Sequence, residues 1–453
     1  MLVNFTFNNW RSFRDTTTLN LVATGEKQHG ERVPEIKDYN FRLLPTAAIY
    51  GGNASGKSNL FKALHFARWM VTEGPTIKGS IPLDTFRLDV SAYKPPCFHF
   101  VILTKDKDGQ EQIYDYRFTL SRSKVLEEKL IWVKKSSEIV LFERQEGKRS
   151  EFHKTITQDA TLHAVLESTR DNQLFLTNAA SQNISKYKTG QVLRVFDWIG
   201  KLTLVSPDDV SVDMMLEQPK KQVESALALL GTGIVELGLE KIDPGSLGMS
   251  ADWLDEMKTR LSGQQTSGAY TRFGDRYLFS NENGELTAHK LVSVHSGNQG
   301  QGGFHFDLKD DSDGTVRVID LLPCFLEASK QGSERVFVID ELDRSLHTLL
   351  VRQLLESYLV SCSPESRAQI LFTTHDVLQM DQNLLRRDEL WVTDRKNDGS
   401  TELIPLSSYK EIRKDKSIRT SYLRGQLGGT PKLLLFGAFP QPEGVPGGVQ
   451  EAQ

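Results

Sequence analysis

The chain has 453 residues, which at roughly 150 residues per domain corresponds to about three structural units. Its 55 basic and 59 acidic residues leave a net charge of −4, which excludes a uniformly basic coat for nucleic acid but permits a local basic patch. Three widely spaced cysteines exclude a disulfide framework and a cysteine-rich zinc site. This cysteine usage predicts a cytoplasmic protein. No apolar run reaches the roughly 18–20 residues that span a bilayer, so we predict that the chain does not enter a membrane.

The first part of the chain predicts strands and one helix, followed by an antiparallel β-lobe. Polar and apolar residues alternate from Leu2 to Asn8, as in a half-buried strand. The apolar run 43–50 predicts a buried strand that ends at two glycines, and residues 58–70 have apolar side chains at helical spacing. Four β-rich runs between residues 98 and 145, separated by turn signals, predict the lobe.

The second part of the chain predicts an insertion and then a parallel sheet. Residues 205–290 contain two amphipathic helical stretches, 222–239 and 251–261, with strand patterns returning in the later part. Two buried-strand patterns, 336–339 and 370–373, then flank a predicted helix. This β–α–β order predicts parallel strands joined by a right-handed crossover.

The strongest chemical signal is a phosphate-binding loop of the form G-x-x-x-x-G-K-S between the predicted strand and helix. Its glycines let backbone amides close around a triphosphate, and the helix N-terminus adds its dipole. Lys57 is expected to reach the β- and γ-phosphates, and the Ser58 hydroxyl to bind Mg²⁺. A simple glycine-rich turn is the alternative, and the complete context disfavours it. The predicted nucleotide-binding residues are Gly51, Gly52, Asn53, Ala54, Ser55, Gly56, Lys57 and Ser58.

Polar residues follow each of the two later buried strands. Asp340 ends the first strand and is expected to help hold Mg²⁺, while Glu341 could orient or deprotonate the attacking water. His375 follows the next strand and can reach the γ-phosphate, although a lone histidine is more often structural. Beside a phosphate-binding loop, these residues predict the hydrolysis of ATP to ADP and phosphate.

The loop extends to G-x-N-x-S-G-K-S-N through Asn59, and this pattern resembles the ABC-type ATPase heads of SMC and RecF proteins and of OLD-like ATPases. The resemblance implies an α/β P-loop NTPase fold that binds ATP and Mg²⁺. It also implies that Ser312 and Gly314 stand where the ABC signature contacts ATP on the opposite subunit, and that Asp343 lies in a D-loop crossing that interface. Such sites imply an ATP-dependent homodimer or higher oligomer. From the residues alone, a simple N-cap at Ser312 is the alternative.

The order of the remaining motifs points to a smaller group within these ATPases. The N-terminal N-W-R-S-F motif and the late R-G-Q-L-G-G-T-P motif are similar to a prokaryotic group of stand-alone ATPases from phage-defence systems. Examples are the PtuA protein of Septu, the AriA protein of PARIS, and the RloA and abortive-infection ATPases. This resemblance suggests Arg11 near the nucleotide, whereas buried-strand packing explains the neighbouring aromatic residues equally well.

Two features depart from ABC heads. Residues 81–90, where the Q-loop should lie, contain no glutamine, so either another residue substitutes or water completes the metal shell. The interval between the two motif regions also has no heptads, which excludes a long-armed SMC protein. We therefore expect the two halves of an ABC-type head (1–204 and 291–437), a mainly helical insertion (205–290) and a disordered tail (438–453).

Three functions are compatible with these motifs. The first is an antiviral ATPase that controls a separate effector, by family analogy a nuclease of HNH, TOPRIM or RloB type. The second is a self-contained OLD-like nuclease, which the short stretch after His375 disfavours because it has no E…DxD cluster. The third is a RecF-like DNA-binding ATPase in repair. Residues 408–432 carry seven basic and two acidic residues, which fits either a phosphate-binding patch or a solvated helix face.

Overall fold

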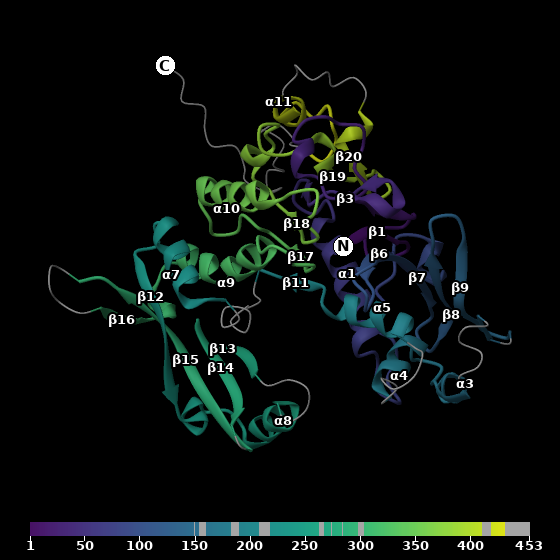
Figure 1. The fold of residues 1–453 in the computed structure, drawn as a ribbon, viewed down its shortest axis with the longest axis horizontal. Coiled ribbons are helices and arrows are strands. Elements are labelled where there is room, and N and C mark those ends of the chain that lie inside the picture. The colour runs from purple at the N-terminus through teal and green to yellow at the C-terminus, as the bar shows by residue number, and fades with distance from the viewer. Residues whose placement is uncertain are drawn as a thin grey trace, which may run out of the picture.

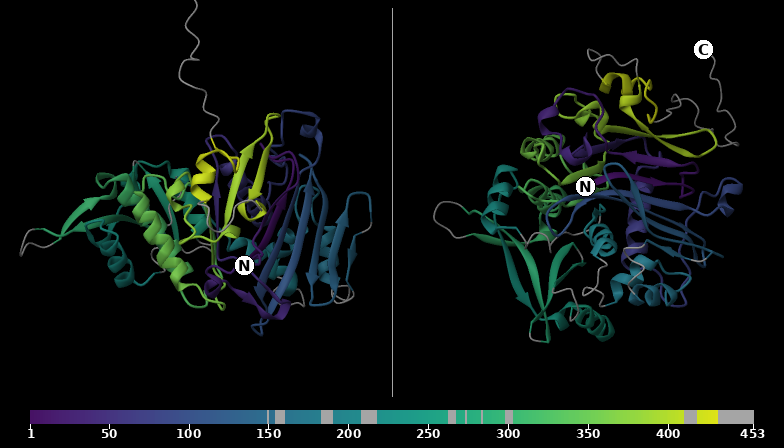
Figure 2. Two further views of the ribbon diagram at one scale, coloured as in Figure 1. Left: turned by 90° about the horizontal axis from the view of Figure 1, so that it is seen from above. Right: turned by 45° about the vertical axis from the view of Figure 1, so that its right-hand side comes forward.

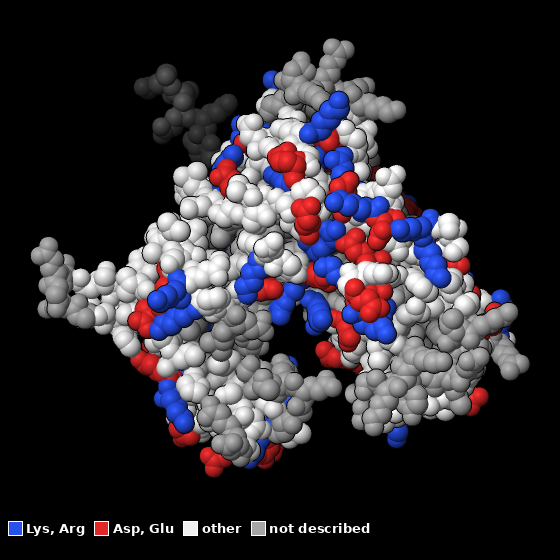
Figure 3. All heavy atoms as spheres, viewed as in Figure 1, with Lys and Arg blue, Asp and Glu red and all other residues white. Residues whose placement is uncertain are grey.

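The computed structural model describes residues 1–148, 150–153, 160–182, 190–207, 218–261, 267–272, 274–282, 284–297, 303–409 and 418–430. A central sheet carries a β-lobe on one side and a separate insertion on the other (Figure 1). The insertion and the β-lobe stay apart in both further views (Figure 2). On the face in Figure 3 a hollow separates them, and acidic and basic side chains are interspersed around it.

The central sheet has six strands in the order β11-β17-β18-β5-β19-β20. All neighbours are parallel except the edge strand β20, which runs antiparallel to β19. The parallel β17–β18 pair with α10 between them confirms the predicted β–α–β unit. The strands are β5 (Thr46–Tyr50), β11 (Thr203–Val205), β17 (Val336–Ile339), β18 (Gln369–Thr373), β19 (Leu390–Arg395) and β20 (Thr401–Pro405).

Both faces of this sheet are buried, which explains why its strands are apolar without alternation. In β5, Ala47 and Ile49 face the core formed with α1 and the β-lobe, whereas Ala48 and Tyr50 face the core formed with α9 and α10. The strand begins at Thr46, three residues later than predicted, because Pro45 has no N–H to donate. The covering helices are α1 (Lys57–Thr72), α9 (Asp313–Ala328) and α10 (Thr348–Ser361).

The predicted antiparallel lobe is confirmed as part of a seven-stranded sheet in the order β10-β9-β8-β7-β6-β1-β2. Gln369 of β18 joins this sheet to the central one, because its side chain bonds the backbone N–H and C=O of Leu2. The strands are β1 (Leu2–Phe7), β2 (Thr17–Asn20), β6 (Cys97–Lys105), β7 (Glu111–Leu120), β8 (Val125–Val133), β9 (Glu138–Gln145) and β10 (Glu151–Phe152). The helices α3 (Ala160–Glu167), α4 (Phe175–Ser181) and α5 (Gly190–Gly200) complete this region, and β3 (Glu35–Ile36) pairs with β4 (Phe41–Arg42).

The insertion is not mainly helical, and this expectation was wrong. Strands take up more of its described part than helices do, in a sheet of order β12-β15-β14-β13 with β16 paired to β15. The predicted helix 222–239 stops at Leu229, because Gly231 and Gly233 take positive φ values and the chain continues as a strand. The elements are α7 (Lys220–Leu229), β12 (Ile234–Ile242), α8 (Ala251–Leu261), β13 (Ser267–Arg272), β14 (Asp275–Glu282), β15 (Glu285–His295) and β16 (Phe304–Asp307).

The C-terminal region ends its described part with α11 (Ile418–Leu423) and a glycine-containing turn. The predicted tail 438–453 lies outside the described residues. Five of the seven basic residues of segment 408–432 also lie outside the described residues, so only Arg419 and Arg424 can be placed. No described helix is both long enough and apolar enough to cross a bilayer.

Candidate nucleotide-binding site

The predicted phosphate-binding loop connects β5 to α1 at the carboxyl edge of the central sheet. Gly51 has φ of 153°, and a Cβ there would lie 2.3 Å from the Thr393 hydroxyl oxygen and 2.4 Å from that of Ser55. Gly56 has φ of 110° and is similarly confined. The turn therefore requires glycine at both positions, which explains the pattern seen in the sequence.

The Lys57 side chain folds back over this loop. Its Nζ donates to the carbonyl oxygens of Gly51 at 2.7 Å and Gly52 at 3.1 Å, and lies 3.4 Å from Nδ1 of His375. Burial lowers the pKa of Lys57 to about 8, against the opposing effect of the carboxylates of Asp340, Asp343 and Glu341. A cation held so close to neutral carbonyls gains strongly from an incoming anion.

A cavity of about 450 Å³ lies over the loop. It brings together nine predicted site residues, including the two catalytic candidates Glu341 and His375, which come from distant segments of the chain. Gly51, Gly52, Asp340, Arg11, Ser312, Gly314 and Asp343 do not line it. The lining residues are Ser12, Asn53, Ala54, Ser55, Gly56, Lys57, Ser58, Asn59, Glu341, His375 and Arg395.

The two acidic residues after β17 are fixed by short hydrogen bonds. The Thr373 hydroxyl donates to Oδ1 of Asp340 at 2.6 Å and accepts the backbone N–H of Glu341 at 2.8 Å. From α9, the buried Arg317 donates to the backbone carbonyls of Asp340 and Glu341, each at 3.3 Å. Asp340 is buried, whereas Glu341 reaches the cavity. The pair thus combines a fixed acid with an accessible one.

His375 lies at the end of β18, where its backbone N–H is 3.2 Å from both carboxylate oxygens of Asp343. Burial and the nearby Lys57 lower the pKa of its imidazole, despite the surrounding carboxylates. The ring is therefore neutral near pH 7 and keeps one N–H to donate.

Arg11 is held away from the cavity. Its guanidinium pairs with Asp84 at 3.2 Å and lies over the Trp10 ring. Asp84 belongs to the segment 81–90 that occupies the expected Q-loop position, and no residue of this fully described segment lines the cavity. Instead, the neighbouring Ser12 reaches it, and its hydroxyl accepts a hydrogen bond from Asn59 at 2.8 Å.

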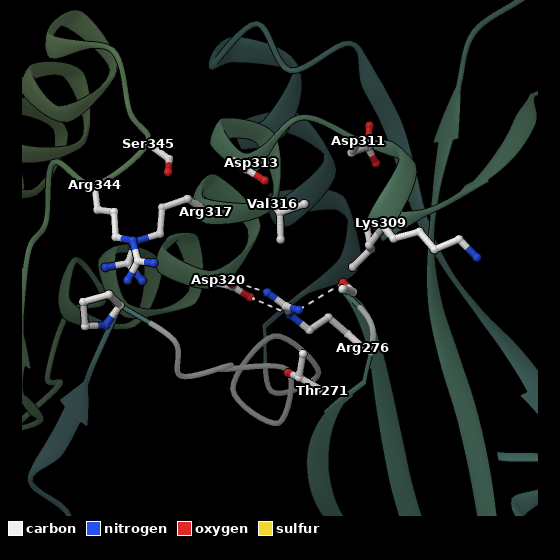
Figure 4. A pocket seen from close by; sticks show the side chains of 13 residues that line it. Thr271, Arg276, Lys309, Asp311, Asp313, Val316, Arg317, Asp320, Arg344 and Ser345 are labelled. Atoms are coloured by element: carbon white, nitrogen blue, oxygen red, sulfur yellow. Dashed lines mark hydrogen bonds and ion pairs between the residues drawn. The ribbon is translucent and has the colours of Figure 1, made fainter. Parts of the chain in front are cut away.

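Ser312 and Gly314 form the N-terminus of α9 on a separate part of the surface. The Ser312 hydroxyl accepts the backbone N–H of Thr315 at 3.1 Å, so the N-cap suggested by the sequence is present. A Cβ on Gly314 would approach the carbonyl oxygen of Ser345 to 2.8 Å. A second cavity, of about 470 Å³, lies beside this helix, where Arg276 of the insertion pairs with Asp320 (Figure 4).

A comparison with known protein families shows to which family the chain belongs. A family model described as "AAA domain, putative AbiEii toxin, Type IV TA system" matches residues 47–188 and 248–381, more than half of the chain. The chain belongs to this family. No curated protein matches it. Among solved structures, it is similar to the SMC head domain from Thermotoga maritima, with 13% identity, a TM-score of 0.36 and coverage of 89% of this chain and 98% of that chain. It is also similar to an SmcHead bound to the C-winged helix domain of ScpA, with 12% identity, a TM-score of 0.37 and coverage of 89% and 97%.

The protein is thus an AAA-family member, and its phosphate-binding loop joins a strand of a mainly parallel sheet to a helix, as in the α/β P-loop fold predicted from the sequence. The residues present fit a magnesium nucleotide. Ser58 and Asp340 offer a hydroxyl and a carboxylate, the oxygen ligands that Mg²⁺ prefers, and bound phosphates commonly complete its shell. Among the described residues, no cluster of three or more His, Cys, Asp or Glu forms an independent metal site.

Three participants were missed by the sequence interpretation. Arg395 and Ser12 line the cavity, and Arg317 bonds the backbone of the acidic pair. The apolar run before the Asn397-Asp398-Gly399 turn is a hairpin signal that could have identified Arg395, but it was not used. Nothing in the local sequence indicated Arg317, because its contact depends on how α9 packs against the end of β17.

Proposed function

We propose that this protein binds and hydrolyses ATP as an ABC-type ATPase and controls a separate effector through nucleotide-dependent assembly. One observation carries the catalytic part of the proposal: Lys57, Glu341 and His375 come from three distant segments and line one cavity over the phosphate-binding loop. A buried cation, an accessible carboxylate and a neutral imidazole at one place are the groups that phosphoryl transfer to water needs.

In this proposal, the backbone amides of the loop and Lys57 hold the β- and γ-phosphates. Mg²⁺ held by Ser58 and Asp340 would neutralise charge on the same phosphates. Glu341 orients the attacking water and accepts its proton, while His375 donates a hydrogen bond to a γ-phosphate oxygen. Thr373 and Arg317 keep the acidic pair in place through the hydrogen bonds described above.

The assembly part of the proposal explains why two predicted residues lie outside the cavity of their own subunit. Ser312 and Gly314 stand at the N-terminus of a 16-residue helix, where backbone N–H groups attract an anion. A second subunit would bring this helix end to the opposite nucleotide and create composite sites. Asp343 would lie near that interface while bonding the backbone of His375. The effector is proposed to be a nuclease in antiviral defence, on the basis of the motif order in the sequence.

The catalytic part is tested by ATP hydrolysis and nucleotide binding of the purified protein. Lys57→Ala should abolish binding, because it removes the cation of the loop. Glu341→Gln should retain binding and lower the turnover rate by at least about a hundredfold, the usual contribution of a general base. Glu365→Gln, which alters an exposed carboxylate, is the matched control and should turn over at the wild-type rate. Hydrolysis at the wild-type rate by Glu341→Gln would refute the assigned base.

The effector part is tested by co-expression with the reading frames that flank the gene. A nuclease that co-purifies with Glu341→Gln in ATP, but not with Lys57→Ala, would support the proposal. Salt-sensitive binding of duplex DNA by this protein alone, with no protein partner, would instead favour the RecF-like alternative.

A further inference from the structure

The hairpin formed by β19 and β20 is fastened to the phosphate-binding loop. The Thr393 hydroxyl lies 2.7 Å from that of Ser55, and the Thr401 hydroxyl donates to the Ser55 backbone carbonyl at 2.9 Å. The backbone N–H of Thr401 also donates to the carbonyl of Ser12 at 2.7 Å. The hairpin is therefore a fixed wall of the site.

Strand geometry directs a third side chain of this hairpin to the same place. Arg395 lies two residues after Thr393, so both side chains are on one face of the strand, and it pairs directly with Thr401 across the hairpin. Both threonines on this face contact the loop, and Arg395 lines the cavity beside them.

The charge on Arg395 is not matched within the described part of the protein, whereas its charged neighbours are engaged. Lys396 pairs with Glu402 at 3.1 Å, and Asp398 pairs with Arg14 at 2.8 Å. Asp394 accepts the backbone N–H of Gly429 at 2.9 Å. No hydrogen bond or ion pair of Arg395 is found among the described residues, and its side chain is exposed to the cavity. An arginine left in this state beside a phosphate-binding loop is suited to an anionic ligand.

The order of the strands decides which end of the nucleotide it would meet. His375 follows β18 and Glu341 follows β17, on one side of β5, whereas Arg395 ends β19 on the other side. Arg395 thus lies away from the γ-phosphate machinery. We infer that Arg395 binds the α-phosphate of the nucleotide and contributes to affinity without taking part in hydrolysis. This inference rests on the proposed function, because it deepens the assignment of the same site.

The test measures the dissociation constants of ATP and ADP by calorimetry, with Glu341→Gln as the background so that ATP stays intact. Arg395→Gln should weaken both nucleotides by the same factor, roughly ten- to a hundredfold, as expected for one charge-assisted hydrogen bond. Arg395→Lys should recover part of the loss because it keeps the charge. Lys396→Gln, which alters the residue directly after the strand, is the matched control and should bind like the background.

The outcomes are distinct. Equal affinities of Arg395→Gln and the background for both nucleotides would overturn the inference while leaving the proposed function intact. A loss confined to ATP would also overturn it, because it would place Arg395 at the γ-phosphate. If the Glu341→Gln protein bound neither ATP nor ADP, both the proposed function and this inference would be refuted. In otherwise wild-type protein, Arg395→Gln should raise KM and leave kcat unchanged.

Discussion

Glu341 has a left-handed backbone, with φ of 50°, although it is not a glycine. This conformation costs roughly 1–2 kcal/mol, so surrounding contacts must hold it. Thr373 accepts its N–H and Arg317 donates to its carbonyl, which fixes the peptide groups on both sides of the residue. The orientation of the Glu341 carboxylate toward the cavity therefore depends on Arg317, a side chain of α9.

Replacing Arg317 with methionine should lower kcat by roughly ten- to a hundredfold, because a small displacement of a catalytic group has effects of that size. The dissociation constant for ATP should not change, since Lys57 and the phosphate-binding loop are untouched. Steady-state kinetics and calorimetry check the two expectations separately. Arg352→Met, which removes a partly exposed arginine of α10, is the control. A parallel loss of nucleotide binding in Arg317→Met would contradict the positioning role.

At the scale of elements, an ion pair joins the insertion to α9. Arg276 of β14 contacts both carboxylate oxygens of Asp320, at 3.0 and 3.4 Å, and both side chains are largely buried (Figure 4). Burial nevertheless raises the pKa of Asp320 above its usual 3.8, although Arg276 acts in the opposite direction. The ionised carboxyl is thus tolerated only because its partner is present.

Arg276→Met should therefore destabilise the protein by about 3 kcal/mol at neutral pH, because a buried carboxylate loses its partner. A carboxyl with a raised folded-state pKa favours folding when protonated, and this contribution is lost as the pH rises through that pKa. The deficit of the variant should accordingly shrink as the pH falls. Urea denaturation of the variant and the wild type, from neutral to acidic pH, measures this difference in the free energy of unfolding.

Two further variants separate the explanations for that result. In an Asp320→Asn background, the deficit caused by Arg276→Met should not depend on pH, because neither of the two proteins compared has a titrating carboxyl at this position. Lys220→Met breaks the exposed Lys220–Glu236 pair of the insertion and should cause only a small loss. A deficit of Arg276→Met that stayed constant as the pH fell would show that lost packing, and not the buried charge, is responsible.

At the scale of the whole molecule, local patterns predicted the nucleotide loop and the strand–helix units around it. Val336–Ile339 and Ala251–Leu261 were predicted at the bounds that β17 and α8 have, because apolar periodicity and capping are local properties. The insertion was misjudged because Leu229 and Ile234, although close in sequence, lie on either side of two glycines that end the helix. The position of the β19–β20 hairpin beside the phosphate-binding loop was missed because it depends on the pairing of β19 with β5, which is distant in sequence.

The proposed composite sites make a prediction that a single subunit cannot satisfy. Ser312→Asn keeps a residue that caps helices well but adds bulk where the opposite nucleotide would lie, so it should inactivate the protein without loss of α9. Lys57→Ala should be inactive because it binds no nucleotide. In a mixed dimer, the loop of the first variant would face the intact Ser312 of the second. Mixing the two inactive proteins in equal amounts should therefore restore roughly a quarter of the wild-type ATPase rate, since half of the dimers would carry one complete site.

A mixture without activity, from subunits shown by labelling to exchange, would exclude composite sites. Full activity of Ser312→Asn alone would exclude a role for this helix end.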